Sequence, residues 1–138
     1  MITLSLFSLF LACGDKSNDT SLTEDTASVE VYSFEGMQFV FQSGEGFELV
    51  GDQLLISFKE DPREMRFSAG CNTHSGEYEM SEDVFTMLGM YATEIGCDMA
   101  LMDQDSWLAT FFMSSPSVVH EGDTITFTGS DATLVFID

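Results

Sequence analysis

Basic residues are scarce in this sequence. Lys and Arg together supply four of its 138 residues, against 24 Asp and Glu, and the formal net charge at pH 7 is −20. Phosphate backbones and anionic lipid headgroups are bound largely through Lys and Arg, which replace their counterions. We therefore expect no nucleic acid partner. The acidic residues are dispersed, which is typical of a solvated surface; divalent cations or a basic partner are the alternatives.

A long hydrophobic run is also missing, since no stretch reaches the roughly 20 apolar residues of a transmembrane helix. Residues 2–12 form a shorter uncharged and largely apolar segment, which favours the hydrophobic region of a secretion signal. This segment leads into the residues LFLACG, in which Ala12 stands directly before Cys13. A small residue before a cysteine at this place suggests a processing site.

The processing site resembles the lipobox of bacterial lipoproteins, in which a signal peptidase cuts before the cysteine and the cysteine is lipidated. The resemblance implies a signal peptide over residues 1–12 and lipidation of Cys13, which would anchor the protein to a membrane of the cell envelope. Gly14 follows the cysteine, and in the usual sorting pattern it favours the outer membrane if the organism has one. The alternatives are a secreted protein cut near Ala12 and a buried cysteine in a core segment.

Residues 13–33 are mostly small, polar or acidic. Such a segment buries too little apolar surface to offset the entropy of ordering it, so we expect a flexible acidic tether. Residues 34–138 are enough for one small domain with its own core. They contain 19 acidic and three basic residues, so the domain alone has a formal charge of −16. The 13 Phe of the chain and its 44% hydrophobic content exclude a wholly disordered protein.

Apolar residues at every second position predict half-buried β-strands in this domain. The alternating sets are Met37, Phe39 and Phe41; Leu54, Ile56 and Phe58; Met65 and Phe67; Tyr78 and Met80; Phe85 and Met87; Ile125 and Phe127; and Leu134 and Phe136. Turn-forming residues at 43–46, 60–63, 121–123 and 129–131 predict tight connections.

One stretch, residues 98–113, breaks the alternation. It has no Gly or Pro, and its apolar residues fall on neighbouring helical turns, so we predict a helix with Asp98 as its N-cap. Pro116 follows and cannot continue a helix. Short strands with one inserted helix predict a mainly β (α+β) fold, either an antiparallel curved sheet or a partly open barrel with one packed helix.

Two sequence blocks carry a family resemblance. Residues 67–78, FSAGCNTHSGEY, resemble the Gly-Cys-Asn signature of META domains, which continues with Ser-Gly and an aromatic residue. Residues 93–97 and 101–108, TEIGC and LMDQDSWL, are similar to the family's second block, in which a cysteine leads into a helix. The resemblance to the META/HslJ family covers nearly the whole domain. It implies an antiparallel β domain with one helix, found in envelope and secreted proteins, loosely linked to stress and drug tolerance and bringing no catalytic residues.

Cys71 and Cys97 are the two cysteines besides Cys13. An exported protein meets oxidants, so we expect a disulfide between them. A second hypothesis is a zinc site, because Cys71 and His74 have ligand-like spacing and Cys97 and His120 could complete a tetrahedral set. A third is two separate buried thiols, which behave as small hydrophobic groups.

Two pairs of acidic residues suggest general acid and base groups or calcium ligands: Glu77 with Glu79, and Asp103 with Asp105. Neither pair has the spacing of a calcium-binding loop, so a solvated strand or helix face is the simpler interpretation. No nucleophile motif or glycine-rich phosphate loop stands out. We expect no catalytic residue, cofactor or metal.

The sequence therefore predicts a lipid-anchored envelope protein with a non-catalytic domain, acting in envelope stress tolerance or in binding an envelope partner. A small-ligand-binding β domain is the alternative, with a ligand inside a curved sheet that Met and Phe fill only partly. The zinc protein using the four residues above is the third hypothesis.

Overall fold

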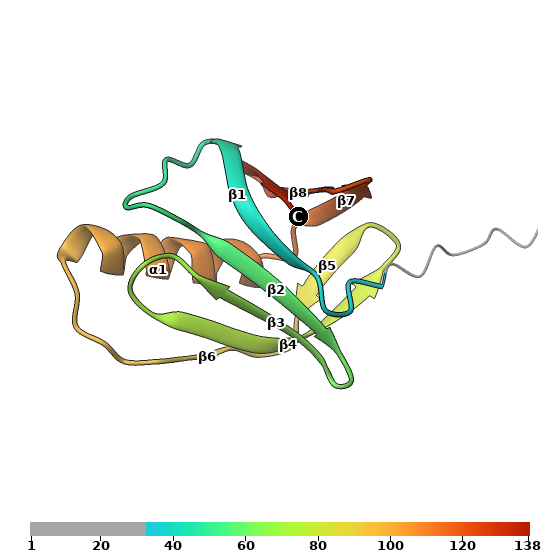
Figure 1. The fold of residues 1–138 in the computed structure, drawn as a ribbon, viewed down its shortest axis with the longest axis horizontal. Coiled ribbons are helices and arrows are strands. Elements are labelled where there is room, and N and C mark those ends of the chain that lie inside the picture. Colours follow the sequence, from blue (N-terminus) through green and yellow to red (C-terminus); the bar gives the residue numbers. More distant parts are fainter. Residues whose placement is uncertain (1–32) are drawn as a thin grey trace, which may run out of the picture.

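The structure, a computed structural model, describes residues 33–138 (Figure 1). The predicted signal peptide, Cys13 and nearly all of the tether lie outside the described residues. Within residues 33–138 the elements are β1 (Gln38–Glu45), β2 (Leu55–Glu60), β3 (Arg63–Ser68), β4 (Thr73–Ser81), β5 (Val84–Met87), β6 (Tyr91–Ala92), α1 (Met99–Met113), β7 (Ser117–Glu121), β8 (Thr124–Thr128) and β9 (Thr133–Ile137).

The strands form a closed antiparallel barrel. Eight of them follow each other in the order β3-β2-β1-β9-β8-β7-β5-β4, and β3 pairs with β4 to complete the ring. The two-residue strand β6 pairs with β4 outside this ring of eight. The weakest junction joins β5 to β7 through one bridge pair, Val84 with Ser117. The predicted fold class is confirmed, with a barrel more closed than the partly open form.

Phenylalanine fills the barrel. The residues predicted to face inward on seven of the strands are almost all buried, and the rings of Phe85, Phe112, Phe127 and Phe136 pack edge to face. Burial of this much aromatic surface is the main stabilising contribution to the domain, because each such side chain buries a large apolar area. The interior of the barrel is therefore a packed core, in contrast to the partly filled interior that the small-ligand alternative expects.

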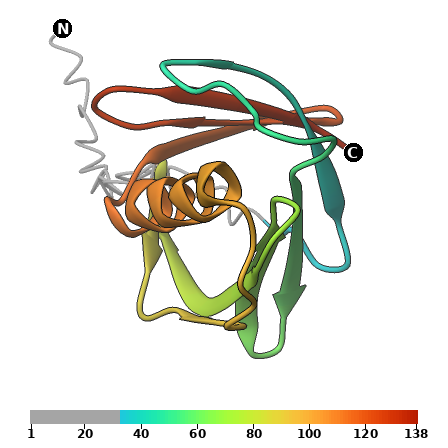
Figure 2. The same cartoon turned by 90° about the vertical axis from the view of Figure 1, so that its left-hand side faces the viewer.

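Helix α1 lies against the barrel beside β5 (Figure 2). It begins after Asp98, as predicted, although the Asp98 side chain makes no capping hydrogen bond, and it ends at Met113 before Pro116. Leu108, Phe111 and Phe112 bury one face against the core. The helix thus covers the side of the barrel where the strands are least continuous.

One predicted turn is wrong. Residues 43–46 were expected to form a tight connection, but β1 continues to Glu45 and pairs with β9 as far as Thr133. The register shifts between Phe41 and Ser43, and Gly44 then pairs with Leu134 as part of the strand. A bulge lets one strand carry an extra residue without ending, which the turn-like composition does not reveal. The predicted turns at 60–63, 121–123 and 129–131 all join neighbouring strands.

Candidate functional site

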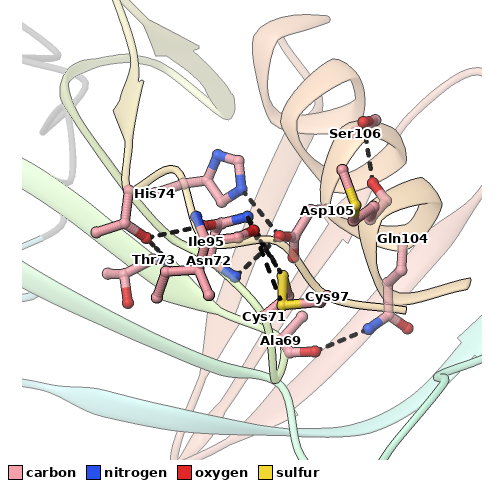
Figure 3. Close-up of a disulfide and its surroundings, with 12 residues drawn as sticks. Ala69, Cys71, Asn72, Thr73, His74, Ile95, Cys97, Gln104, Asp105 and Ser106 are labelled. Atoms are coloured by element: carbon pink, nitrogen blue, oxygen red, sulfur yellow. Dashed lines mark hydrogen bonds and ion pairs between the residues drawn. A yellow bond between two sulfur atoms is a disulfide. The ribbon is translucent and has the colours of Figure 1, made fainter. Parts of the chain in front are cut away.

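The residues of the Gly-Cys-Asn segment connect three parts of the chain at one end of the barrel. Cys71 follows β3, and Cys97 lies in the segment that leads into α1; their sulfur atoms are joined in a disulfide (Figure 3). Gly70 has a φ of +92°, a conformation that residues with a Cβ rarely adopt. This glycine turns the chain out of β3, so that the cysteine faces its partner.

Asn72 holds the segment before α1 in place. Its side-chain carbonyl accepts hydrogen bonds from the Ile95 N–H at 2.7 Å and the Thr93 hydroxyl at 3.0 Å, and its side-chain amide donates to the Ile95 carbonyl at 3.3 Å. Its backbone N–H donates to the Asp105 carboxylate at 2.9 Å. One asparagine therefore links the β3–β4 turn, the 93–97 segment and the helix.

Two polar side chains of α1, Gln104 and Asp105, are buried against this turn. Gln104 accepts a hydrogen bond from the Val50 N–H at 2.6 Å, and its amide donates to the carbonyls of Val50 and Ala69, both at 3.0 Å. These bonds satisfy loop backbone groups that have no strand partner. Sequence analysis missed both roles, and the expected solvated helix face is wrong for Asp105, although Asp103 is exposed.

His74 lies between the barrel and the helix. Its ring stacks on Phe67 with centroids 4.6 Å apart, and its Nε2 is 3.8 Å from Asp105 Oδ2. That distance is too long for a hydrogen bond, and both His74 Nε2 and Asp105 Oδ1 are buried without a hydrogen-bond partner. Such unsatisfied groups are uncommon in folded proteins, so this pair is a local polar weak point at the base of the helix.

A groove runs between β6 and the second half of α1, beside His74. It has a volume of about 660 Å³ and is mostly lined by apolar or small side chains. We call it the seam groove; its lining residues are His74, Met90, Tyr91, Ala92, Ala109, Thr110, Met113 and Ser114. Tyr91 is 61% exposed and Met113 46% exposed, so the groove opens to solvent.

Comparison with known proteins identifies the domain. The META domain family model matches residues 27–138. The chain belongs to the META domain family. The match begins within the segment that we predicted to be the tether. None of the curated proteins matches the sequence.

Two solved structures share the META fold of this chain. One, described as the NMR structure of a protein, is 23% identical, has a TM-score of 0.62, and covers 75% of this chain and 90% of its own. The other, an NMR structure of a protein from Burkholderia xenovorans, is 12% identical with a TM-score of 0.63, and covers 75% of this chain and 82% of its own. At these identities the likeness concerns the fold.

The META motif residues thus have structural explanations in this chain. Gly70 turns the chain out of β3, and Asn72 holds the segment before α1 in place. The Gly of the Ser-Gly pair is explained by close packing, because a Cβ on Gly76 would collide with the carbonyl of Gly89, between β5 and β6. Close approach of two backbones needs a glycine. The motif therefore shapes the β3–β4 turn and its contact with the helix.

The zinc hypothesis is not supported in this META domain. The disulfide uses both Cys71 and Cys97, and His120 lies elsewhere, with its ring against Phe34 and Phe39. Within residues 33–138 no three His, Cys, Asp or Glu side chains gather in a metal-binding arrangement.

None of the helical structure in this range has the length and apolar character that crossing a membrane requires.

A second polar network lies at another place on the META barrel. Tyr78 donates its hydroxyl proton to Glu60 at 2.8 Å, and Arg63 Nε donates to the same carboxylate at 3.1 Å. Burial and the neighbouring carboxylate raise the pKa of Tyr78 well above its usual value. Burial also acts to raise the pKa of Glu60, but the hydrogen bonds from the Phe34 N–H and Tyr78, together with the charge of Arg63, lower it overall. The tyrosine therefore stays protonated and serves as a donor.

Proposed function

We propose that this protein is a lipid-anchored protein of the cell envelope whose META domain acts by binding a partner, not by catalysis. The observation that carries the proposal is the seam groove, an open and mainly apolar surface between β6 and α1. Large apolar patches that remain exposed on a folded protein mark interaction or ligand-binding sites. Tolerance of envelope stress would be the cellular consequence of this binding.

The anchoring part of the proposal rests on the sequence. An apolar segment ending in Ala12-Cys13 precedes about twenty small, polar and acidic residues, a spacer long enough to hold a domain away from a membrane. Several acyl chains on Cys13 would hold the domain firmly, since each buried methylene contributes about 0.8 kcal/mol. In an organism with two membranes, we propose the outer one as its location.

The polar side chains of the domain support binding over catalysis. Gln104 and Asn72 use their side chains on backbone groups of neighbouring loops. Tyr78 donates its hydroxyl proton to Glu60, and Glu60 also accepts hydrogen bonds from the Phe34 N–H and from Arg63. A catalytic acid or base needs a proton within reach of substrate, whereas these groups are committed to contacts inside the domain.

A small apolar ligand is a second candidate occupant. The seam groove volume of about 660 Å³ falls within the roughly 300–1,000 Å³ of typical small-molecule sites. Its lining contains Met90 and Met113, whose flexible side chains adapt to ligands of different shape. In this form the ligand would lie in the seam groove, between β6 and α1.

Mass measurement and a deletion strain test the proposal together. Protein extracted from membranes should have lost residues 1–12 and gained acyl chains on Cys13, and a Cys13→Ala variant should leave the membrane fraction. In the deletion strain, wild type should restore growth under detergent or antibiotic stress, whereas Cys13→Ala expressed at equal level should restore less. An intact N-terminus without a fatty adduct would overturn the anchoring. Full rescue by Cys13→Ala would overturn the need for it.

A further inference from the structure

The seam groove follows from a gap in the strand pairing. β5 and β6 lie one after the other along the same side of β4, pairing with Tyr78–Ser81 and with His74–Ser75 respectively. β5 has β7 on its other side, with Val118 donating to the Asp83 carbonyl and Phe85 to the Pro116 carbonyl. Within residues 33–138 no strand pairs with the other side of β6. β6 therefore has one free edge.

The backbone at this free edge lacks partners. The Thr93 N–H donates to the Thr73 carbonyl of β4, and in an antiparallel pair the backbone groups of successive residues face opposite sides. The N–H and C=O of Ala92 thus point away from β4, at the open edge of β6, and the same residue lines the groove. Within residues 33–138 neither group has a hydrogen-bond partner. An unpaired strand edge is a template for another strand.

The side chains beside the edge suit an extended peptide. Ala92 is paired with the buried His74, so its side chain shares the face that looks toward α1. Ala109 and Met113 of the helix form the opposite wall. A strand added beside β6 would direct every second side chain toward this apolar wall and the others outward.

The outward side chains of such a strand would meet negative charge. Glu64 accepts a hydrogen bond from the Tyr91 hydroxyl at 3.1 Å, and Glu77 lines the hollow beside Tyr91. Glu94 is exposed just beyond β6. The nearby Arg66 is engaged with Ser75, at 3.2 Å, and with Glu64. The local field therefore favours a basic strand, and the domain's charge of −16 opposes a second copy of this chain.

We propose that β6 is a docking edge for an extended peptide segment of an envelope partner, with basic and apolar side chains in alternation. The backbone of the segment pairs with Ala92, its apolar side chains enter the seam groove, and its Lys or Arg side chains meet the glutamates. This is strand addition, a general mode of peptide recognition. The inference rests on the proposed function and names the chemistry of the partner at the same groove.

A designed peptide tests the docking edge. The probe is capped, fluorescein-labelled Lys-Val-Lys-Leu-Lys-Val-Lys, titrated with the mature, detergent-extracted protein at about 0.15 M salt and followed by fluorescence anisotropy. Two control peptides separate the contributions: one with alternate backbone nitrogens methylated and one with Glu in place of every Lys. Both controls should bind at least about tenfold more weakly, through lost backbone pairing and through charge repulsion.

Two protein variants locate the binding. Ala92→Pro removes the N–H that faces the groove and leaves the pairing with β4, because a proline is tolerated where the N–H points off the sheet. Met113→Arg places a bulky cation in the groove. Met102→Arg is the matched control, since this side chain is on the same helix and equally exposed, 45% against 46% for Met113, but does not line the groove. Circular dichroism checks that each variant folds.

The proposal expects saturable binding that falls at least about tenfold in Met113→Arg, about fivefold in Ala92→Pro and less than twofold in Met102→Arg. Equal binding of the methylated peptide or of both groove variants would overturn it, since attraction would then be electrostatic only. Dimers that Ala92→Pro abolishes would make a second copy the occupant. If the peptide does not bind but an apolar dye binds wild type and not Met113→Arg, strand addition is overturned. The proposed function would then still stand.

Discussion

The closed wall of the barrel and the seam beside α1 are built in opposite ways. The wall consists of strands with continuous pairing over a core of aromatic rings, such as Phe127 between Phe85 and Phe136. The seam has one bridge pair between β5 and β7, a two-residue strand and a helix with buried polar groups. Apolar packing thus specifies the wall, whereas side-chain hydrogen bonds specify the seam.

The difference teaches where such a domain has room for function. A closed, dry core tolerates few changes, because any missing volume leaves a cavity. The seam instead contains unsatisfied polar atoms on His74 and Asp105, a free strand edge and exposed methionines. Regions with fewer buried apolar contacts open more easily than the rest of a fold. We therefore expect binding, and any movement that accompanies it, at the seam.

Phe127→Ala should produce the largest loss of stability. The ring is fully buried and packs edge to face on three others, so its removal should cost about 3–5 kcal/mol of unfolding free energy. Met113→Ala at the seam should cost less than about 0.5 kcal/mol, because this side chain is half exposed. Urea unfolding followed by circular dichroism measures both. Similar losses in the two variants would contradict the contrast between wall and seam.

The wall was also the part that sequence could predict. Alternation of apolar residues places Ile56, Phe67 and Ile125 in the core, and all three are buried, because a half-buried strand must repeat every second residue. The helix could also be predicted, because the alternation stops at residues 98–113 and the apolar residues there fall on neighbouring helical turns. Barrel closure could not, since it depends on the pairing of β3 with β4 and β1 with β9, and strand order leaves no local mark on the sequence.

Asp105→Ala should have an intermediate effect on stability. It leaves the Asn72 N–H without its acceptor, and an unpaired buried donor costs about 1–3 kcal/mol. Asp105→Asn keeps a carbonyl acceptor of the same shape, so it should recover most of this loss. Asp103→Ala is the control, because that side chain is exposed. Urea unfolding measures the stability of each variant. If Asp105→Ala and Asp105→Asn lose equal stability, the hydrogen bond to the Asn72 N–H does not explain why Asp105 is buried.

The seam exceeded what sequence could predict for a physical reason. A buried Asp105 and an exposed Asp103 differ only in which side of α1 meets the β3–β4 turn, and composition favours the solvated reading for both. The signal that was present lies in spacing: Gln104 and Asp105 occur in the block after Cys97, beside the apolar positions of the helix. Asn72 likewise acts through backbone groups of Ile95, 23 residues away along the chain, which no local pattern reveals.

The smallest effect should come from Glu60, which forms a polar network with Tyr78 and Arg63 on the wall. Because its hydrogen bonds and Arg63 lower the pKa of this carboxyl below that in the unfolded chain despite burial, its contribution to stability is present above about pH 4.5 and is lost as pH falls through the lowered folded value. Glu60→Gln should therefore lose about 1 kcal/mol or less near pH 7 and show a shallower decline in stability between about pH 5 and pH 3. Tyr78→Phe, which removes one donor to this carboxylate, should keep the acid-dependent decline but weaken it. If the stability of Glu60→Gln falls as steeply with decreasing pH as that of wild type, other carboxylates and not this network cause the loss of stability in acid.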